Sequence, residues 1–216
     1  MKCKRMKRKI VSLLATISLS CVSGVCLAQD FSADVVYVTP GKAAATAAAT
    51  LASTRPPSKL YVSTSKMRLE TRGITGTILL VNSEDHTTVA LFPGQKSYQP
   101  LASAPSEYFH VQDSENACAD WQAASELKIS CEKVGHEELN GRQTVKYQNK
   151  NATLAAPVSA VWIDPSLNFV AKWEGKDAGA ELRNITKEEK LSSALFEIPQ
   201  GYDLLKPKKK PKKSAK

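Results

Sequence analysis

Residues 134–150 read VGHEELNGRQTVKYQNK and contain Asn140-Gly141, the strongest short sequence signal for a β-hairpin. A two-residue turn at Asn140-Gly141 sets the register outward from the turn and places His136 opposite Val145. Side chains alternate between the two faces of a strand, so the more apolar face of this hairpin is predicted to hold Val134, His136, Val145 and Tyr147. This stretch therefore predicts two antiparallel strands joined by a tight turn.

The same register bears on whether the hairpin carries chemistry. His136 and the adjacent Glu137 would form an acid–base pair only if both side chains lay on one face, and the alternation separates them. His86 falls in a turn, and His110 precedes an acidic loop. The sequence contains no HExxH, GxSxG or glycine-rich phosphate loop. We therefore interpret His136 as structural and predict no catalytic residue, no metal site and no cofactor.

Most of the remaining chain shows short alternating or apolar runs separated by turn residues. Further strands are predicted at 33–39, 59–65, 66–72, 76–82, 87–92, 96–101, 158–164, 169–174, 180–186 and 194–199. Turn residues at 83–86 and 165–168 predict two more hairpins. Strands this short and regular are typical of an antiparallel meander, so we predict a mainly β (α+β) fold with a curved sheet or barrel.

Two segments depart from the strand pattern. A short helix is predicted over 114–126, because Ser114 can cap it and Ala117, Trp121 and Ala124 fall on one face. The Ala/Thr-rich stretch 41–57 fits a short helix or a mobile loop, with the loop favoured, and it is a candidate lid for a cavity.

The hairpin around 165–168 indicates what the sheet encloses. Pairing Asp164 with Phe169 places Trp162 opposite Ala171, and both faces of the hairpin are then partly apolar. A sheet with one face in water would have one polar face. Two partly apolar faces therefore predict a covering helix or an apolar cavity, with a plainly packed core as the alternative. The predicted cavity wall consists of Ile78, Leu80, Trp162, Phe169 and Trp173.

The formal net charge of +9 is concentrated at the two ends of the chain. Six of the 30 basic residues lie within residues 1–28 and seven within 206–216, which leaves 17 against all 21 acidic residues in the body. This mildly acidic body does not fit a nucleic-acid-binding domain, which carries a basic patch of its own. The tail KPKKKPKKSAK is predicted to be a disordered basic segment able to meet an anionic membrane or envelope surface.

The first 28 residues resemble a secretory signal peptide, with a basic start, an apolar stretch and small residues at Cys26 and Ala28. Cleavage between Ala28 and Gln29 is expected, with an uncleaved anchor as the alternative. We predict export to the periplasm of a Gram-negative bacterium, a single domain at 29–205 and the tail at 206–216. The exported part keeps Cys118 and Cys131, whose even number and spacing predict one structural disulfide.

Five segments, in order, resemble an exported family of uncharacterised function whose fold is similar to that of the periplasmic lipoprotein carrier LolA. They read KLYVSTSKMRLETRG, TILLVNSEDHTTVALFPGQKSYQPL, ACADW with CEKVGHEELNGRQTVKY, VWIDPSLNFVAKWEG and ALFEIPQGY, and they span about Leu60 to Tyr202. The resemblance implies an unclosed antiparallel barrel that wraps around short helices and contains an apolar cavity.

The resemblance also implies one site residue. In the carrier, an arginine in an FRW-like strand motif helps to hold the cavity lid, and MRL occupies that place here, so Arg68 is carried over as a ligand-site residue. Leu69 stands where the carrier has tryptophan, and the carrier has no counterpart of the Cys118–Cys131 pair.

These observations leave three functions to compare. The first is a monomeric, non-enzymatic periplasmic protein whose hydrophobic cavity carries or senses lipids, acyl chains or lipoproteins. The second is a cell-envelope protein–protein interaction module with a filled core and no ligand. The third, a hydrolase, lacks a clustered site in the predicted register. The volume of the cavity distinguishes the first function from the second.

Overall fold

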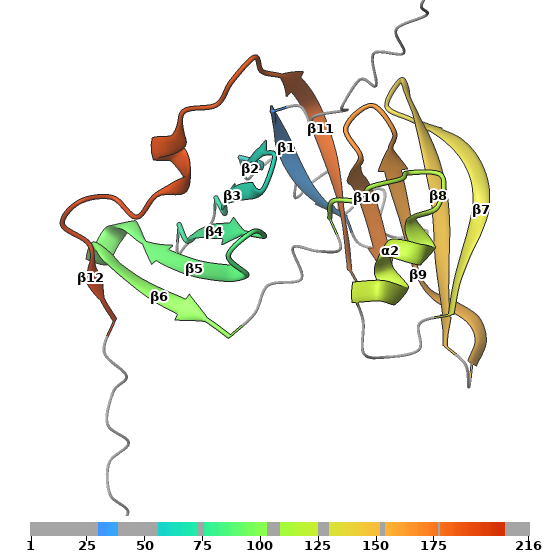
Figure 1. Ribbon diagram of the computed structural model, residues 1–216, viewed down its shortest axis with the longest axis horizontal. Helices are drawn as coiled ribbons and strands as arrows, with labels where there is room; N and C mark the ends of the chain where they lie inside the picture. Colours follow the sequence, from blue (N-terminus) through green and yellow to red (C-terminus); the bar gives the residue numbers. More distant parts are fainter. Residues whose placement is uncertain are drawn as a thin grey trace, which may run out of the picture.

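The computed structural model describes residues 30–38, 56–72, 76–102, 109–124, 130–151, 154–176 and 178–205. Twelve strands form one sheet in the order β12-β6-β5-β4-β3-β2-β1-β11-β10-β9-β8-β7 (Figure 1). The sheet is not closed, since β12 and β7 form its two edges. The prediction of a mainly β fold built on an unclosed curved sheet is confirmed. The predicted leader, the tail and most of the stretch 41–57 lie outside the described residues.

The chain forms two antiparallel meanders, β1–β6 and β7–β11, which are joined where β1 pairs with β11. The first contains β1 (Phe31–Val38), β2 (Ser58–Ser63), β3 (Lys66–Glu70), β4 (Ile78–Asn82), β5 (Thr87–Phe92) and β6 (Ser97–Leu101). The second contains β7 (Ser130–Leu139), β8 (Arg142–Asn151), β9 (Leu154–Asp164), β10 (Phe169–Gly175) and β11 (Gly179–Lys187). The described residues also form η1 (Pro93–Gln95), α2 (Ala117–Ala124), η3 (Ser193–Phe196) and β12 (Asp203–Leu204).

The β7–β8 hairpin has the predicted turn. Asn140 and Gly141 both have positive φ, at 51° and 75°, as a two-residue type I′ turn requires. The predicted register holds as far as Gly135 opposite Lys146, and then a bulge shifts it so that Lys133 faces Tyr147. Val134 is the additional residue of this bulge and is 49% exposed, so it is not buried beside Tyr147, which corrects the prediction.

The β9–β10 hairpin also contains a bulge, and here the predicted register is wrong. Phe169 pairs with Asp164 as expected, but Lys172, rather than Ala171, lies opposite Trp162. Ala171 is the additional residue of the bulge. A shift of one residue moves every later side chain to the other face, so Trp162 and Trp173 lie on opposite faces of the sheet.

The C-terminal part differs from the strand predicted at 194–199. The short helix η3 occupies this position. Pro199 has no N–H to donate to a neighbouring strand, and a side chain from β3 is hydrogen-bonded to the backbone of the segment. The Arg68 guanidinium donates to the Leu195 carbonyl at 2.8 Å, which ties η3 to β3. β12 then runs parallel to β6, and the Asp203 amide donates to the Lys96 carbonyl at 2.9 Å. The segment thus crosses from β11 to the far edge of the sheet (Figure 1).

One face of the sheet, here called the core face, carries two buried clusters. The first centres on β1, β2 and β11 and includes Phe31, Leu60 and Leu182. The second lies beneath α2 and contains Ala117, Trp121, Val145, Tyr147, Ile163 and Val170. Phe109 and Trp173 pack against both clusters. The prediction of a short helix in this region is confirmed with narrower bounds, and Trp121 is its main buried side chain, with 4% exposure.

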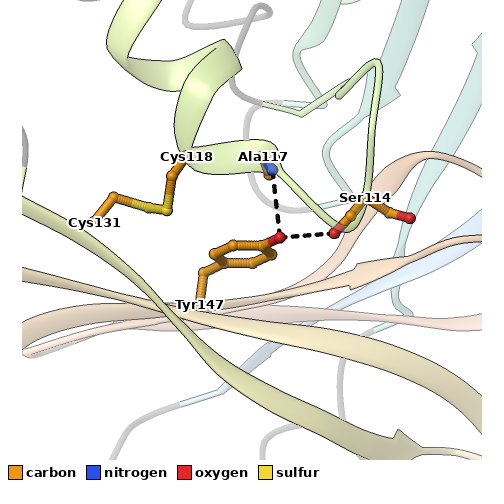
Figure 2. The surroundings of a disulfide bond; sticks show 5 residues. All are labelled: Ser114, Ala117, Cys118, Cys131 and Tyr147. Carbon is orange, nitrogen blue, oxygen red and sulfur yellow. Dashed lines mark hydrogen bonds between the residues drawn. A yellow bond between two sulfur atoms is a disulfide. The ribbon is translucent and has the colours of Figure 1, made fainter.

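A disulfide and the hydrogen bonds of one tyrosine hold α2 on the sheet (Figure 2). Cys118 and Cys131 form the predicted disulfide, with 5.6 Å between their Cα atoms, and link the helix to β7. The buried Tyr147 hydroxyl donates to the Ser114 carbonyl at 2.9 Å and accepts from the Ala117 amide at 3.3 Å. Burial raises the pKa of Tyr147. Within the described residues, no helix has the length and apolar character needed to span a bilayer.

Candidate functional site

A cavity of about 200 Å³ lies on the core face beside the first cluster. Its wall comes from β1, β2, β3, β10 and β11, with Phe109 added from the segment before α2. Residues of the wall include Tyr37, Leu60, Leu69, Trp173, Ala180 and Leu182. The interior is therefore not packed solid at this position.

The cavity lies where β10 separates from β11. These strands pair only from Lys172 opposite Glu181 to Glu174 opposite Gly179. The beginning of β10 pairs with the segment 109–111 instead: the Val170 amide donates to the Phe109 carbonyl at 2.9 Å. Meanwhile β11 continues along β1. The diverging strands leave a space that their side chains do not fill.

Exposure of the wall residues distinguishes the mouth of the cavity from its floor. Tyr37 is 56% exposed. It pairs with Ala180 on β11, which in turn pairs with Trp173 on β10, so the three side chains form a row across the strands. Phe169 and Leu60, by contrast, are only 1% and 4% exposed. The cavity therefore opens near Tyr37 and ends near Phe169.

The electrostatics of the cavity are simple. Among its described wall residues Lys172 alone is charged, and its ammonium lies on the opposite face of the sheet. There the Lys172 Nζ is 2.8 Å from a Glu174 carboxylate oxygen and 4.3 Å from the centre of the Trp162 ring. The wall thus presents apolar side chains to the interior, a surface suited to hydrocarbon.

Two of the predicted wall residues, Phe169 and Trp173, line the cavity. Trp162 does not, because the Ala171 bulge turns it to the opposite face. Its ring lies between the ammonium groups of Lys146 and Lys172, at 4.7 and 4.3 Å from the ring centre. Its indole N–H donates to Glu137 at 2.7 Å. The hydrogen bonds from Lys146 and Trp162 lower the pKa of Glu137.

The other predicted site residues, Arg68, Ile78 and Leu80, are also on the opposite face. Arg68 pairs with Leu80 across β3 and β4, and the cavity-lining Leu69 pairs with Leu79. The Arg68 side chain is 13% exposed and donates to Glu70 at 2.7 Å and to the Leu195 carbonyl. In this structure Arg68 fastens the C-terminal segment and does not contact the cavity.

Leu60, Met67 and Leu69 line the cavity from β2 and β3 and were not among the predicted wall residues. Their signal is the alternation of KLYVS and KMRLE, in which every second residue is apolar. Alternation identifies the face but does not indicate that the strands enclose a space.

Charged side chains outside the cavity wall form ion pairs and hydrogen bonds, some exposed and some buried. Glu137 and His136 point to opposite sides, and His136 lies 3.7 Å from Glu115 with its side chain 57% exposed. Burial raises the pKa of Glu181, but hydrogen bonds from Arg183 and Asn140 outweigh it and leave that pKa lowered. A hydrogen bond from Asn184, with help from Lys59, lowers the pKa of Asp34. In the described part of the chain, no three ligating side chains are grouped to hold a metal ion.

His110 lies beside the floor of the cavity. Its ring is 4.8 Å from that of Phe169, edge to face, and burial lowers its pKa to about 4. Among the described residues, no group is hydrogen-bonded to its buried Nε2. A neutral imidazole in this position adds to the apolar surroundings of the floor.

No family model matches the sequence, and no curated protein matches it. The fold resembles solved structures at low identity. An uncharacterized conserved protein from Thermus thermophilus has a TM-score of 0.49 and 9% identity, over 83% of this chain and 91% of that chain. For PNGF-II the TM-score is 0.48 and the identity 10%, over 82% of this chain and 31% of that chain.

A LolA superfamily protein from Nitrosomonas europaea is also among the structures that this chain resembles. Its TM-score is 0.32 and its identity 10%, over 79% of this chain and 90% of that chain. At these values the likeness concerns the arrangement of strands and says nothing about what the chain binds.

Proposed function

We propose that this protein is an exported, non-enzymatic binding protein that holds an acyl chain in its cavity and thereby carries or senses lipids or acylated proteins. The observation that supports the proposal is a space of about 200 Å³ with an apolar wall and an open end. Transfer of hydrocarbon from water into such a space is favourable by about 25 cal/mol per Å² of buried surface.

The alternative, an interaction module with a filled core, is less well supported because the core face contains this space. A hydrolase is also less well supported. His136 and Glu137 diverge, and the carboxylates with lowered pKa are paired with cations or amides away from the cavity.

Tryptophan fluorescence tests the proposal directly. The chain has three tryptophans, and only Trp173 lines the cavity. A Trp121→Phe/Trp162→Phe variant keeps Trp173 as the single reporter, and micromolar dodecanoate should change its emission. The matched Trp121→Phe/Trp173→Phe variant keeps Trp162 on the opposite face and should show no change. An unchanged Trp173 signal in a folded protein would contradict the proposal.

A blocking substitution tests the location of the site. Ala180 is 6% exposed and lines the cavity, so Ala180→Leu should fill the space and weaken dodecanoate binding at least about tenfold, since a ligand loses the contacts of several buried methylenes. The control is Ala160→Leu, which adds the same atoms on β9 opposite Glu174, outside the cavity wall. Equal weakening in both variants would place the binding elsewhere.

The proposal includes export and contact with an anionic surface. Leu204 and Leu205 are 52% and 39% exposed and directly precede the seven lysines of 206–216. Lysines near an anionic bilayer contribute about 1 kcal/mol each. The protein should therefore sediment with anionic vesicles at low salt and not with neutral ones, and replacing the seven lysines by glutamine should abolish this. Mass spectrometry of the exported protein should show Gln29 as its first residue.

A further inference from the structure

The geometry points to a cavity that accepts a single unbranched alkyl end, inserted methyl group first to a depth of about eight carbons, while the remaining chain and the head group stay outside. This inference rests on the proposed acyl-binding function and narrows it to one chain in one orientation.

The volume limits the number of chains. A cavity of about 150 Å³ is known to hold benzene, with its six carbons, so a space of about 200 Å³ holds on the order of eight. Pockets that enclose a whole drug-sized ligand measure roughly 300–1,000 Å³. Two long chains side by side therefore do not fit within the described wall, and a single long chain fits only in part.

The wall sets the direction of insertion. At the floor, Phe169, Leu60 and Leu182 offer apolar surface, and burying a polar head group against them would cost its hydrogen bonds with water. At the mouth, the exposed Tyr37 borders solvent. The methyl end of the chain therefore belongs at the floor and the head group beside Tyr37.

Packing contacts hold Phe169 in place at the floor, and this limits how deeply an alkyl chain can enter the cavity. The Phe169 ring contacts Phe31 edge to face at 5.3 Å and stacks on Phe109 at 5.9 Å. The hydrogen bond between the Val170 amide and the Phe109 carbonyl holds the segment behind it. Beyond Phe109, the space under α2 is occupied by Trp121 and its neighbours. A longer chain cannot continue into that region.

A series of straight 1-alkanols from hexanol to dodecanol measures the depth, with the variant that retains Trp173 as its single tryptophan as reporter. The dissociation constant should fall about fourfold with each methylene, the factor for burial of one CH₂, and should level off near octanol. A fourfold gain that continues to dodecanol would overturn the limited depth and leave the proposed function intact. Absence of binding by every alkanol would overturn the proposed function itself.

Direction is tested by comparing 1-octanol with 1,8-octanediol. The diol must place a hydroxyl at the apolar floor and should bind on the order of tenfold more weakly. Equal affinities would overturn the methyl-first orientation.

A pair of variants on neighbouring strands tests whether the wall sets the depth. Leu69→Ala removes three carbons from the wall, which enlarges the cavity and should move the plateau to alkanols longer by up to about three carbons. Leu79→Ala removes the same atoms from the partner residue on β4, outside the wall, and should leave the plateau at octanol. If the plateau of a folded Leu69→Ala protein stays at octanol, the cavity wall does not determine chain length.

Discussion

The region under α2 and the region around the cavity share one face of one sheet, but only the first is filled. Under α2, the indole of Trp121 meets the Tyr147 ring at 5.5 Å between centres, and Val145 and Ile163 are fully buried. Around the cavity, strands with equally apolar side chains surround about 200 Å³ of space. The apolar face of a sheet therefore does not by itself produce a filled core; an element fastened above it does.

The largest expected effect is the loss of the side chain that fills the first region. Trp121→Ala should lower the free energy of unfolding by about 3–5 kcal/mol, because it removes a large buried ring and leaves a void. Urea denaturation measures the change. Gln122→Ala, at the adjacent exposed position of α2, should alter stability by less than about 0.5 kcal/mol. Similar losses in both variants would mean that α2 does not fill the region.

Removal of the disulfide should come next. Cys118→Ala/Cys131→Ala frees α2 from β7 and should cost about 3 kcal/mol, the value expected for a loop of this length. Denaturant unfolding of the variant and of the wild type under oxidising conditions gives the difference. Dodecanoate binding to the folded variant should persist, since neither cysteine lines the cavity. Loss of binding without loss of stability would show that the two regions are coupled.

His110 lies between the two regions and predicts a pH effect. Its pKa is about 4 in the folded chain and about 6.5 in the unfolded chain, so folding favours the neutral form. The free energy of unfolding therefore has its full value above about pH 6.5 and decreases as the pH falls below it. By pH 4 the decrease due to His110 is roughly 3 kcal/mol. Unfolding free energies measured across this range test the prediction.

The variant His110→Phe should flatten the pH dependence between 6.5 and 4, and His136→Gln at an exposed position should retain it. Protonation of carboxylates with lowered pKa, such as Glu137, also destabilises the fold at lower pH. This contribution is the same in both proteins and cancels when their profiles are compared. An unchanged profile in His110→Phe would rule out the imidazole as the source.

The smallest effect is the most direct comparison of the two regions. Val145→Ala creates a void in a filled site and should cost more than Val35→Ala, which enlarges an open cavity, by about 1 kcal/mol. Both valines are buried, at 0% and 7% exposure, so the same two carbons are removed from similar depth. Equal costs in urea denaturation would indicate that the cavity region packs as tightly as the region under α2.

Local signals in the sequence were sufficient for much of the fold. Asn140-Gly141 predicted its turn because few residues tolerate two successive positive φ angles, and alternation predicted most strands. The even pair of cysteines predicted the disulfide. Each of these features depends on residues that are adjacent in the sequence or on the number of cysteines.

The errors arose where the structure depends on distant contacts. The bulge at Ala171 has no glycine to mark it, and it reversed the face of Trp162. Ile78 and Leu80 are as apolar as Leu79 and Leu69, so the choice of face on β3 and β4 required knowledge of where the C-terminal segment lies. That segment was itself predicted as a strand from its apolar run, although Arg68 holds it as η3.

The position of β1 at the centre of the sheet has a consequence for how the chain reaches its final form. β1 must pair with β11, and the two strands are joined by contacts such as Asn184 to Asp34, 150 residues apart. Each meander contains mostly local pairings, whereas this seam closes a very long loop at a high entropic cost. Non-local pairing of this kind slows the folding of all-β proteins, which takes on the order of milliseconds to seconds. Until β11 has emerged and docked, both meanders present an open edge, and the newly made chain is most vulnerable to aggregation during that interval.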